Sequence, residues 1–102
     1  HVSYSGGDLP DHVSVTAYYV ASEGVTNAVK HSGARRVALD VRRADDGLHV
    51  AVHDDGAGGA RIAGGTGLAM LHDRVRALGG RLSVTDRQPA GTSLVAVIPC
   101  GS

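Results

Sequence analysis

The sequence predicts an α+β fold: a two-layer sandwich in which a mixed, mostly antiparallel sheet of about five strands is covered on one face by helices. Two segments, at about 10–31 and 68–78, carry apolar residues every three to four positions, which is typical of helices packed on one side. Other segments alternate apolar and polar residues, as half-buried strands do. Short glycine-containing turns join neighbouring strands and favour antiparallel pairs. The order strand, helix, strand, strand, helix, strand, strand differs from a Rossmann alternation.

The first helix is expected after a short edge strand at residues 1–5. Asp8 is a candidate cap, and Pro10 is expected in the first turn. Ser32-Gly33 is expected to end the helix near His31. The predicted apolar stripe consists of Val13, Ala17, Ala21, Val25 and Ala28.

The strands follow in two hairpin-like pairs. Residues 37–41 and 48–52 alternate around Asp45-Asp46-Gly47, which has the chemistry of a hairpin turn. Residues 54–65 are rich in glycine and have almost no periodicity, so they predict a loop. The second helix is expected to end at Gly79-Gly80, before strands at 81–85 and 92–98.

Composition limits the class of protein. The chain has 102 residues, which suggests one domain spanning 1–102, and its formal charge is zero, which argues against a nucleic-acid partner. Cys100 is the only cysteine and cannot form an internal disulfide. No apolar run has the roughly 18 residues of a membrane span. We expect a cytoplasmic domain, whose parent protein could be anchored in a membrane.

Four polar side chains share one edge of the first helix. At 100° per residue, Glu23, Asn27, Lys30 and His31 fall within an arc of roughly 100°, away from the predicted apolar stripe. One interpretation is a solvated polar face with an i,i+4 pair. The other is a functional edge, because asparagine is a poor helix former and its amide oxygen is a suitable ligand for Mg²⁺.

A second polar motif, Asp54-Asp55-Gly56-Ala57-Gly58-Gly59, comes directly after a strand. An ionised carboxylate at a strand end accepts hydrogen bonds only, which suits the amino group of adenine, and the glycines allow the base to approach the backbone. The motif is also compatible with an ordinary acidic turn. A calcium loop of the EF-hand type would need further ligands and a distal Glu, which are missing.

The third motif, Gly64-Gly65-Thr66-Gly67-Leu68, opens the second helix. Free backbone N–H groups at a helix N-terminus favour phosphate, although a flexible connector is an equally simple interpretation. The pattern matches neither the P-loop nor the Rossmann fingerprint. Gly91-Thr92 begins the last strand, where a threonine hydroxyl could reach a phosphate or serve as an ordinary strand residue.

Taken together, the order and spacing of these motifs resemble the GHKL superfamily of ATPases, which includes gyrase, the heat-shock chaperone ATPase, MutL and histidine kinases. Glu23-x-x-x-Asn27-x-x-Lys30-His31 is similar to the N box, Asp54-x-Gly56-x-Gly58 to the first glycine box, and Gly65-x-Gly67-Leu68 to the second. The subgroup of histidine kinases that serve NarL-type regulators is the nearest resemblance. It is indicated by His31, by the short lid at residues 60–63 and by the run at 71–82.

The resemblance implies a Bergerat fold and a role for each matching residue. Asn27 would coordinate Mg²⁺, and Lys30 and His31 would contact phosphate. Asp54 would bind the adenine amine beside Gly56 and Gly58, and Thr92 would support the adenine or phosphate side. Glu23 would position Mg²⁺ or water, with action as a general base possible. The nucleotide would also contact the start of the second helix, at Gly65, Thr66, Gly67 and Leu68.

The implied activity is that of a histidine protein kinase with ATP and Mg²⁺ as cofactors. The γ-phosphoryl group would pass to a His on a dimerisation domain that this chain lacks, and then to an Asp of a response regulator. We expect a homodimeric parent protein, and a monomeric fragment that binds ATP without phosphorylating itself. Ser22, Met70 and Leu71 depart from the subgroup's usual residues and put the packing of the lid in doubt.

Two alternatives remain open at this level. An anti-sigma-factor type of serine kinase has the same motifs but usually a longer lid. A non-catalytic module that binds nucleotide or protein partners is a different class, against which the intact Asn27, Lys30 and Asp54 argue.

Overall fold

The computed structural model describes residues 2–5, 9–31, 33–56, 67–86 and 90–100, with the backbone alone at residues 2–5 and 31. Its elements follow the predicted order, except that the first helix has two parts. The elements are β1 (Val2–Ser5), α1 (Asp11–Thr26), η1 (Asn27–His31), β2 (Val37–Ala44), β3 (Gly47–Asp54), α2 (Leu68–Ala77), β4 (Arg81–Asp86) and β5 (Thr92–Ile98).

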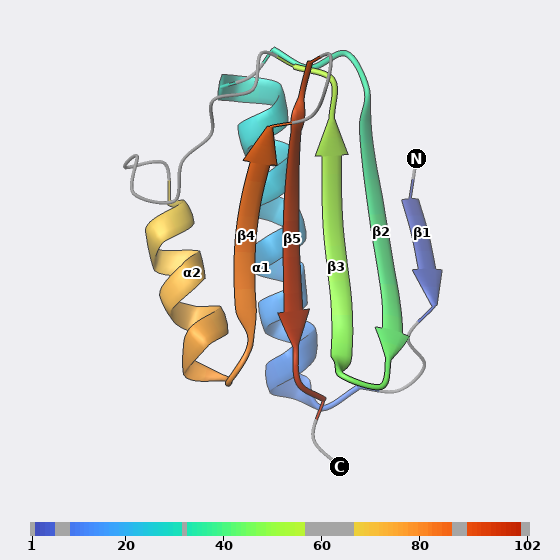
Figure 1. Cartoon of the computed structure of the whole chain (residues 1–102), viewed down its shortest axis with the longest axis vertical. Helices are drawn as coiled ribbons and strands as arrows, with labels where there is room; N and C mark the ends of the chain where they lie inside the picture. The colour runs from blue at the N-terminus through green and yellow to red at the C-terminus, as the bar shows by residue number, and fades with distance from the viewer. Residues whose placement is uncertain (1, 6–8, 32, 57–66, 87–89, 101–102) are drawn as a thin grey trace.

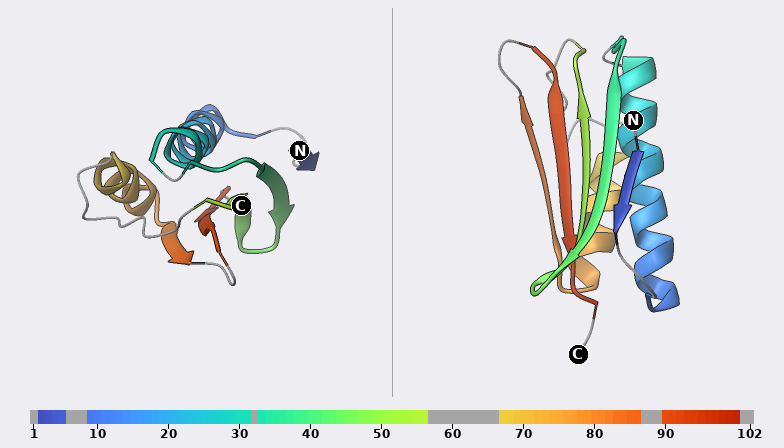
Figure 2. Two further views of the ribbon diagram at one scale, coloured as in Figure 1. Left: turned by 90° about the horizontal axis from the view of Figure 1, so that it is seen from above. Right: turned by 90° about the vertical axis from the view of Figure 1, so that its right-hand side faces the viewer.

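The strands form one five-stranded sheet in the order β1-β2-β3-β5-β4. β1 runs parallel to β2, and all other neighbours are antiparallel, so the predicted mixed, mostly antiparallel sheet is confirmed. Both helices lie on the same face of this sheet, as the three ribbon views show (Figures 1 and 2). β5 lies between β3 and β4, which places the end of β3 beside the beginning of β5.

The core lies between the sheet and the helices and is made of aliphatic side chains. Leu48, Val50 and Val52 of β3 stand opposite Ile98, Ala96 and Leu94 of β5, in that order. Each of these residues is buried, because alternate positions of both strands face the helices. The core cluster is completed by Val13, Val20, Leu68, Leu71, Val75 and Leu82.

The start of α1 differs from the prediction by one position. Pro10 is the residue that precedes the helix, and its carbonyl oxygen accepts hydrogen bonds from the backbone N–H groups of Val13 and Ser14, each at 3.0 Å. Asp8, the predicted cap, lies outside the described residues. Proline tolerates this position because its missing N–H would have no partner in a first turn.

The predicted apolar stripe of α1 is confirmed in part: Val13 and Ala28 are buried, and Ala17 and Val25 pack against the core. Ala17, Ala21 and Val25 are only half-buried, whereas the line in contact with the sheet is Val13, Thr16, Val20 and Gly24. The cause is Gly24, which lacks a side chain and lies against β3 and β5. A Cβ built there would stand 2.7 Å from Val52 Cγ2 and 3.0 Å from Leu94 Cδ2. The helix is therefore rotated to bring its smallest residue onto the sheet.

The prediction of one continuous α-helix to His31 is also wrong, because the last turn is a π-helix. η1 begins at Asn27, and beyond it the N–H of Ala34 donates to the carbonyl of Ala28 at 2.9 Å. Gly33 follows with φ of 62°, a left-handed value that favours glycine, so the predicted end of the helix at Ser32-Gly33 is confirmed. Single π turns in helices are often found at functional sites.

The end of α2 agrees with the sequence. Gly79 has φ of 82°, and its N–H donates to the carbonyl of Arg76 at 2.9 Å. In the part of the chain that the structure describes, neither helix is long and apolar enough to cross a membrane.

Candidate functional site

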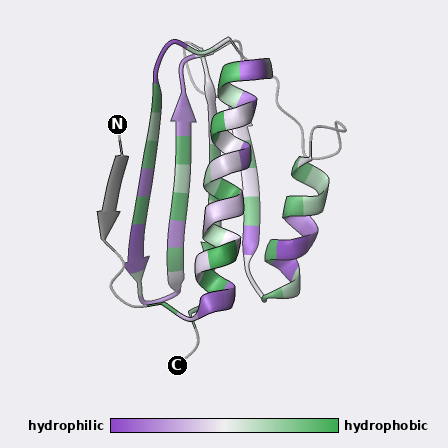
Figure 3. Cartoon of the chain, turned by 180° about the vertical axis from the view of Figure 1, so that it is seen from behind, coloured by the Kyte–Doolittle hydropathy of each residue, from purple (hydrophilic) through white to green (hydrophobic). Residues whose placement is uncertain are grey.

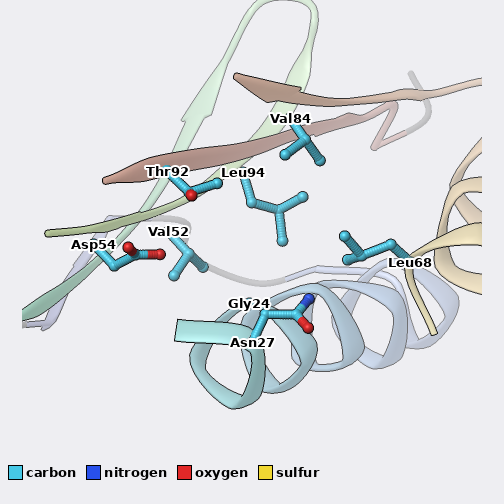
Figure 4. A pocket seen from close by; sticks show the side chains of 8 residues that line it. All are labelled: Gly24, Asn27, Val52, Asp54, Leu68, Val84, Thr92 and Leu94. Atoms are coloured by element: carbon cyan, nitrogen blue, oxygen red, sulfur yellow. The ribbon is translucent and has the colours of Figure 1, made fainter. Parts of the chain in front are cut away.

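A buried pocket lies between the sheet and the C-terminal part of the first helix, where β3 ends and β5 begins (Figure 4). Its walls are mostly aliphatic, and its polar groups are the side chains of Asp54, Thr92 and Asn27. The complete set of described lining residues is Gly24, Asn27, Val52, Asp54, Leu68, Val84, Thr92 and Leu94. An apolar pocket with a few convergent polar groups is the usual form of a small-molecule site.

The polar end of the pocket is made by two strands. Asp54 is the last residue of β3 and pairs with Thr92, the first residue of β5, so both side chains face the helices. The Asp54 side chain is buried at 5% exposure, and its Oδ1 accepts a hydrogen bond of 2.8 Å from the N–H of Gly56. Gly56 thereby orients the carboxylate. From the sequence, we expected this glycine only to leave room for the base.

Gly91 explains how closely these strands approach each other. It has φ of 113°, and a Cβ at this position would collide with the carbonyl oxygen of Asp54. A residue with a side chain would push β5 away from β3 at this end of the sheet. The glycine therefore holds Thr92 beside Asp54.

The hydroxyl of Thr92 is a buried polar group without a partner. Its Oγ1 is shielded from solvent and makes no hydrogen bond within the described structure. Such a group costs roughly 1–3 kcal/mol unless a ligand or water satisfies it. It is therefore available to a ligand group in the pocket, next to a carboxylate that can accept a hydrogen bond.

Asn27 enters the same pocket from the helix side. It is the first residue of the π turn, its side chain is 7% exposed, and Gly24 lies one turn before it. The expectation that Asn27 lies on an edge remote from the buried face is therefore wrong, because the buried line of α1 continues through Gly24 into Asn27. Its amide now lines the pocket together with Asp54 (Figure 4).

Glu23 has a different position. It lines an open groove between the helices, together with Tyr19, Gly67, Met70, Leu71 and Arg74. A Cβ on Gly67 would collide with Oε1 of Glu23, so this carboxylate packs against the residue that precedes α2. Gly67 has φ of 90°, and no side chain caps the helix. Glu23 and Asn27 therefore face two adjacent spaces.

The other predicted site residues divide into three groups. Leu68 is buried at 1% exposure and lines the pocket. Lys30 is exposed on η1 and is not among the described residues that line either space. Gly58, Gly65 and Thr66 lie outside the described residues, as does the side chain of His31.

Sequence reasoning missed four lining residues: Gly24, Val52, Val84 and Leu94. The alternation of the strands could have placed the three aliphatic ones on the helix-facing side of the sheet. Gly24 carried a signal of its own, because a glycine within a helical pattern costs about 1 kcal/mol and usually has a packing reason.

Asp55 supports the site from outside. Its Oδ1 accepts hydrogen bonds from the backbone N–H groups of Arg35, at 2.8 Å, and Arg36, at 3.0 Å. These bonds lower the pKa of the Asp55 carboxyl below its usual 3.8, and the bond from Arg36 has the larger effect. The carboxylate ties the segment after η1 to the end of β3.

Comparison with known proteins identifies the family. The model of the family described as histidine kinase-, DNA gyrase B-, and HSP90-like ATPase matches residues 12–102. The chain belongs to this family. The predicted resemblance to the ATPase domains of sensor histidine kinases is thus confirmed.

Relatives of this ATPase domain include sensor kinases. This chain is 31% identical over 90 residues to the nitrate/nitrite sensor protein NarX of Escherichia coli. The match covers 85% of this chain and 15% of NarX. The chain is 38% identical over 80 residues to the signal transduction histidine-protein kinase/phosphatase UhpB of Salmonella typhimurium, covering 76% of this chain and 16% of UhpB. The chain therefore spans only a small part of these proteins.

Solved structures agree on the fold. The histidine kinase domain of a blue-light activated histidine kinase from Erythrobacter litoralis superposes with a TM-score of 0.78 at 29% identity. The match covers 97% of this chain and 51% of that domain. The predicted two-layer sandwich is the architecture of histidine kinase ATPase domains.

Proposed function

We propose that this ATPase domain binds ATP·Mg²⁺ and serves a histidine protein kinase, passing the γ-phosphoryl group to a His elsewhere in the parent protein. The observation that carries the proposal is the buried pair of Asp54 and Thr92 at the end of an aliphatic pocket. The carboxylate accepts and the hydroxyl can donate or accept, which suits the amino group and ring nitrogen of adenine. The aliphatic side chains of Val52, Val84 and Leu94 offer flat contact to a base.

The phosphates are assigned to the opposite side of the pocket. Gly67 precedes α2 and offers no capping side chain, so the first backbone N–H groups of the helix would bind an anion with the help of the helix dipole. We include Gly65, Thr66 and Leu68 in this contact, with Gly58 on the adenine side. Lys30 and His31 follow Asn27 by about one turn and would neutralise phosphate charge.

Among the described residues, we assign Mg²⁺ to Asn27. The described residues contain no group of three or more His, Cys, Asp or Glu side chains that could hold a metal ion. Mg²⁺ requires few protein ligands when phosphates complete its coordination, and a buried amide oxygen is a suitable one. When bound, the ion would supply charge neutralisation for phosphoryl transfer.

Glu23 would act on the phosphate side, where it borders the start of α2. We propose that Glu23 positions Mg²⁺ or water, and general-base action on that water is a further role it could have.

The described lining of the pocket leaves less room than a nucleotide base needs, and we propose that the pocket opens when ATP binds. Its present volume is about 10 Å³, room for roughly one water molecule. Leu68 closes one side and belongs to the first turn of α2, so a movement of α2 away from α1 would admit a base. This coupling would let the nucleotide set the position of the helix that begins beside its phosphates.

The test is calorimetric titration of the Asp54→Asn variant with Mg·ATP. Losing a hydrogen bond to a charged group costs roughly 1.5–3 kcal/mol, so the affinity should fall roughly tenfold to a hundredfold. Asp45→Asn, in the exposed hairpin turn, is the matched control and should bind as the wild type does. Wild-type affinity of the Asp54→Asn variant would show that the adenine assignment is wrong.

The phosphoryl acceptor distinguishes the kinase classes. We propose a His of the dimerisation region as acceptor, followed by an Asp of a response regulator, in a homodimeric parent. Incubating the parent with labelled ATP should give an acid-labile, alkali-stable phosphoprotein, as expected of phosphohistidine. An acid-stable product would favour the serine kinase, and ATP binding without phosphorylation would favour a non-catalytic module.

A further inference from the structure

The connection between η1 and β2 is fastened to one carboxylate at the end of β3. Oδ1 of Asp55 accepts hydrogen bonds from the backbone N–H groups of both Arg35 and Arg36, at 2.8 and 3.0 Å. The N–H of Asp55 in turn donates to the carbonyl oxygen of Arg36 at 3.3 Å. Two adjacent residues of the connection are therefore held by the residue that directly follows β3.

The same connection is also bonded back to the π turn. The N–H of Ala34 donates to the carbonyl oxygen of Ala28, and Ala28 is fully buried and directly follows Asn27 in the chain. A path of peptide and hydrogen bonds therefore runs from Asp55 through residues 34–36 into η1. Because π turns are rare in proteins, we expect this one to depend on the bonds that fasten its end.

The path lies at the end of the domain where a helix and two strands meet. In Figure 1, the C-terminal end of the first helix, the beginning of β2 and the end of β3 all lie at this end. Seen from behind, the last turn of the helix and the end of β3 both carry hydrophilic bands there (Figure 3). Polar groups of the helix and of the sheet are thus gathered at one end, and the Asp55 carboxylate links their backbones.

Two of the proposed nucleotide contacts stand at the two ends of this path. Asp54 directly precedes Asp55, and Asn27 is the first residue of η1. The Asp54 carboxylate is oriented by the N–H of Gly56, and its backbone is held by pairing with Thr92. Asp54 therefore has supports of its own, whereas the connection that follows the turn of Asn27 is held by Asp55.

We propose that Asp55 is a positioning residue for Asn27. By holding residues 34–36, it fixes the π turn and with it the direction in which the Asn27 amide enters the pocket. The proposal rests on the proposed function, because it assigns the effect to Mg²⁺-dependent binding of ATP. Asp55 itself is exposed and is not among the described residues that line the pocket, so it acts through the backbone and not by touching the nucleotide.

The test is calorimetric titration of the Asp55→Ala variant with ATP, once with Mg²⁺ and once with EDTA. The ratio of the two dissociation constants measures the contribution of the metal. Residues that orient a metal ligand typically affect metal affinity by tenfold or more, so this ratio should fall by roughly tenfold. The affinity for adenosine should stay within about twofold of wild type. Asp45→Ala, in the exposed hairpin turn, is the matched control and should change neither quantity.

A double-mutant cycle shows whether Asp55 acts through Asn27. Asn27→Ala alone should remove most of the Mg²⁺ effect, and adding Asp55→Ala should then change the ratio little. Asp55→Asn retains an accepting oxygen at the same place and should recover most of the ratio. Val41→Ala separates this role from general stability: it weakens core packing from β2, away from the connection, and should keep the wild-type ratio.

Hydrogen exchange provides a measurement that requires neither nucleotide nor metal. In the free chain, Asp55→Ala should accelerate exchange of the Ala34 amide several-fold, because its bond to Ala28 would lose the support of the connection. The amide of Val50, in the middle of β3, should exchange as in the wild type. Unchanged exchange at Ala34 would contradict the link between Asp55 and the π turn.

The outcomes separate this proposal from the proposed function. If the wild type binds no ATP, the proposed function fails, whatever the exchange of Ala34 shows. If ATP binds and the Asp55→Ala variant keeps the wild-type Mg²⁺ ratio, the positioning proposal is overturned. Adenosine affinity that falls as much as Mg·ATP affinity would also overturn it, because Asp55 would then act through Asp54. Asp55→Ser, whose side chain is shorter than the carboxylate, replaces the alanine variant if that variant does not fold, with the same expectations.

Discussion

Asp54 and Thr92 stand directly opposite each other on β3 and β5, and both side chains are buried at the same end of the pocket. One is a carboxylate oriented by the N–H of Gly56, and the other is a hydroxyl without a hydrogen-bond partner in the described structure. Their adjacency depends on Gly91, where any side chain would collide with the Asp54 carbonyl. The buried Thr92 hydroxyl therefore destabilises the empty fold, and a ligand with a matching polar group would satisfy it.

Replacing Thr92 with valine separates stability from binding. Because Oγ1 has no partner, its removal should leave the free energy of unfolding unchanged or raise it by about 1 kcal/mol. The affinity for Mg·ATP should fall by roughly tenfold if the hydroxyl meets the base. Urea denaturation and calorimetry measure the two effects, with Thr85→Val on exposed β4 as the control. Unchanged ATP affinity would remove Thr92 from the site.

Gly24→Ala should destabilise the domain although alanine is the better helix former. The helix propensity gain is about 1 kcal/mol, but the new methyl group would stand 2.7 Å from Val52 Cγ2. Overpacking of this kind costs about 1–3 kcal/mol, so we expect a net loss and a weaker affinity for ATP, because Gly24 lines the pocket. Ser22→Ala, exposed on the same helix, should be neutral or slightly stabilising. Equal stability of the two variants would contradict the close approach of α1 to the sheet.

Glu23 and Gly67 should be energetically coupled. Gly67→Ala forces a side chain into a left-handed conformation and against the Glu23 carboxylate, so it should destabilise by at least about 1–2 kcal/mol. In a Glu23→Ala background, only the backbone cost remains and the loss should be smaller. A double-mutant cycle by denaturant unfolding measures the difference. Additive effects would mean that the carboxylate moves away freely.

Asp55→Asn should lower stability at neutral pH and have little effect in acid. The folded-state pKa of Asp55 lies below 3.8, so its carboxylate stabilises the fold above the unfolded pKa, and this contribution is lost as the pH falls through the folded pKa. The difference in urea midpoint between wild type and Asp55→Asn should be constant above about pH 5 and shrink from about pH 4 downward. A difference that does not vary with pH would show that the bonds from Arg35 and Arg36 do not depend on the charge.

Local sequence patterns were sufficient to predict the helices and strands and to single out several candidate site residues. The alternation of residues 48–52 and 94–98 predicts two half-buried strands, and the glycines at 33 and 79 mark helix ends because only a left-handed residue closes them. Asp54 and Thr92 could be recognised as polar residues at strand ends. Their chemistry followed from the residue types, since a buried carboxylate and hydroxyl need polar partners.

The residue pattern alone was therefore enough for the list of elements, their periodicity and the residues that we propose to bind a nucleotide. Only the tertiary structure decided that β5 pairs with β3, that β1 is parallel, that Gly24 and Asn27 share the buried line, and that the helix ends in a π turn. The reason is physical. Hydrophobic periodicity specifies which side of an element is buried only approximately, whereas strand order and helix rotation depend on contacts between residues far apart in the chain.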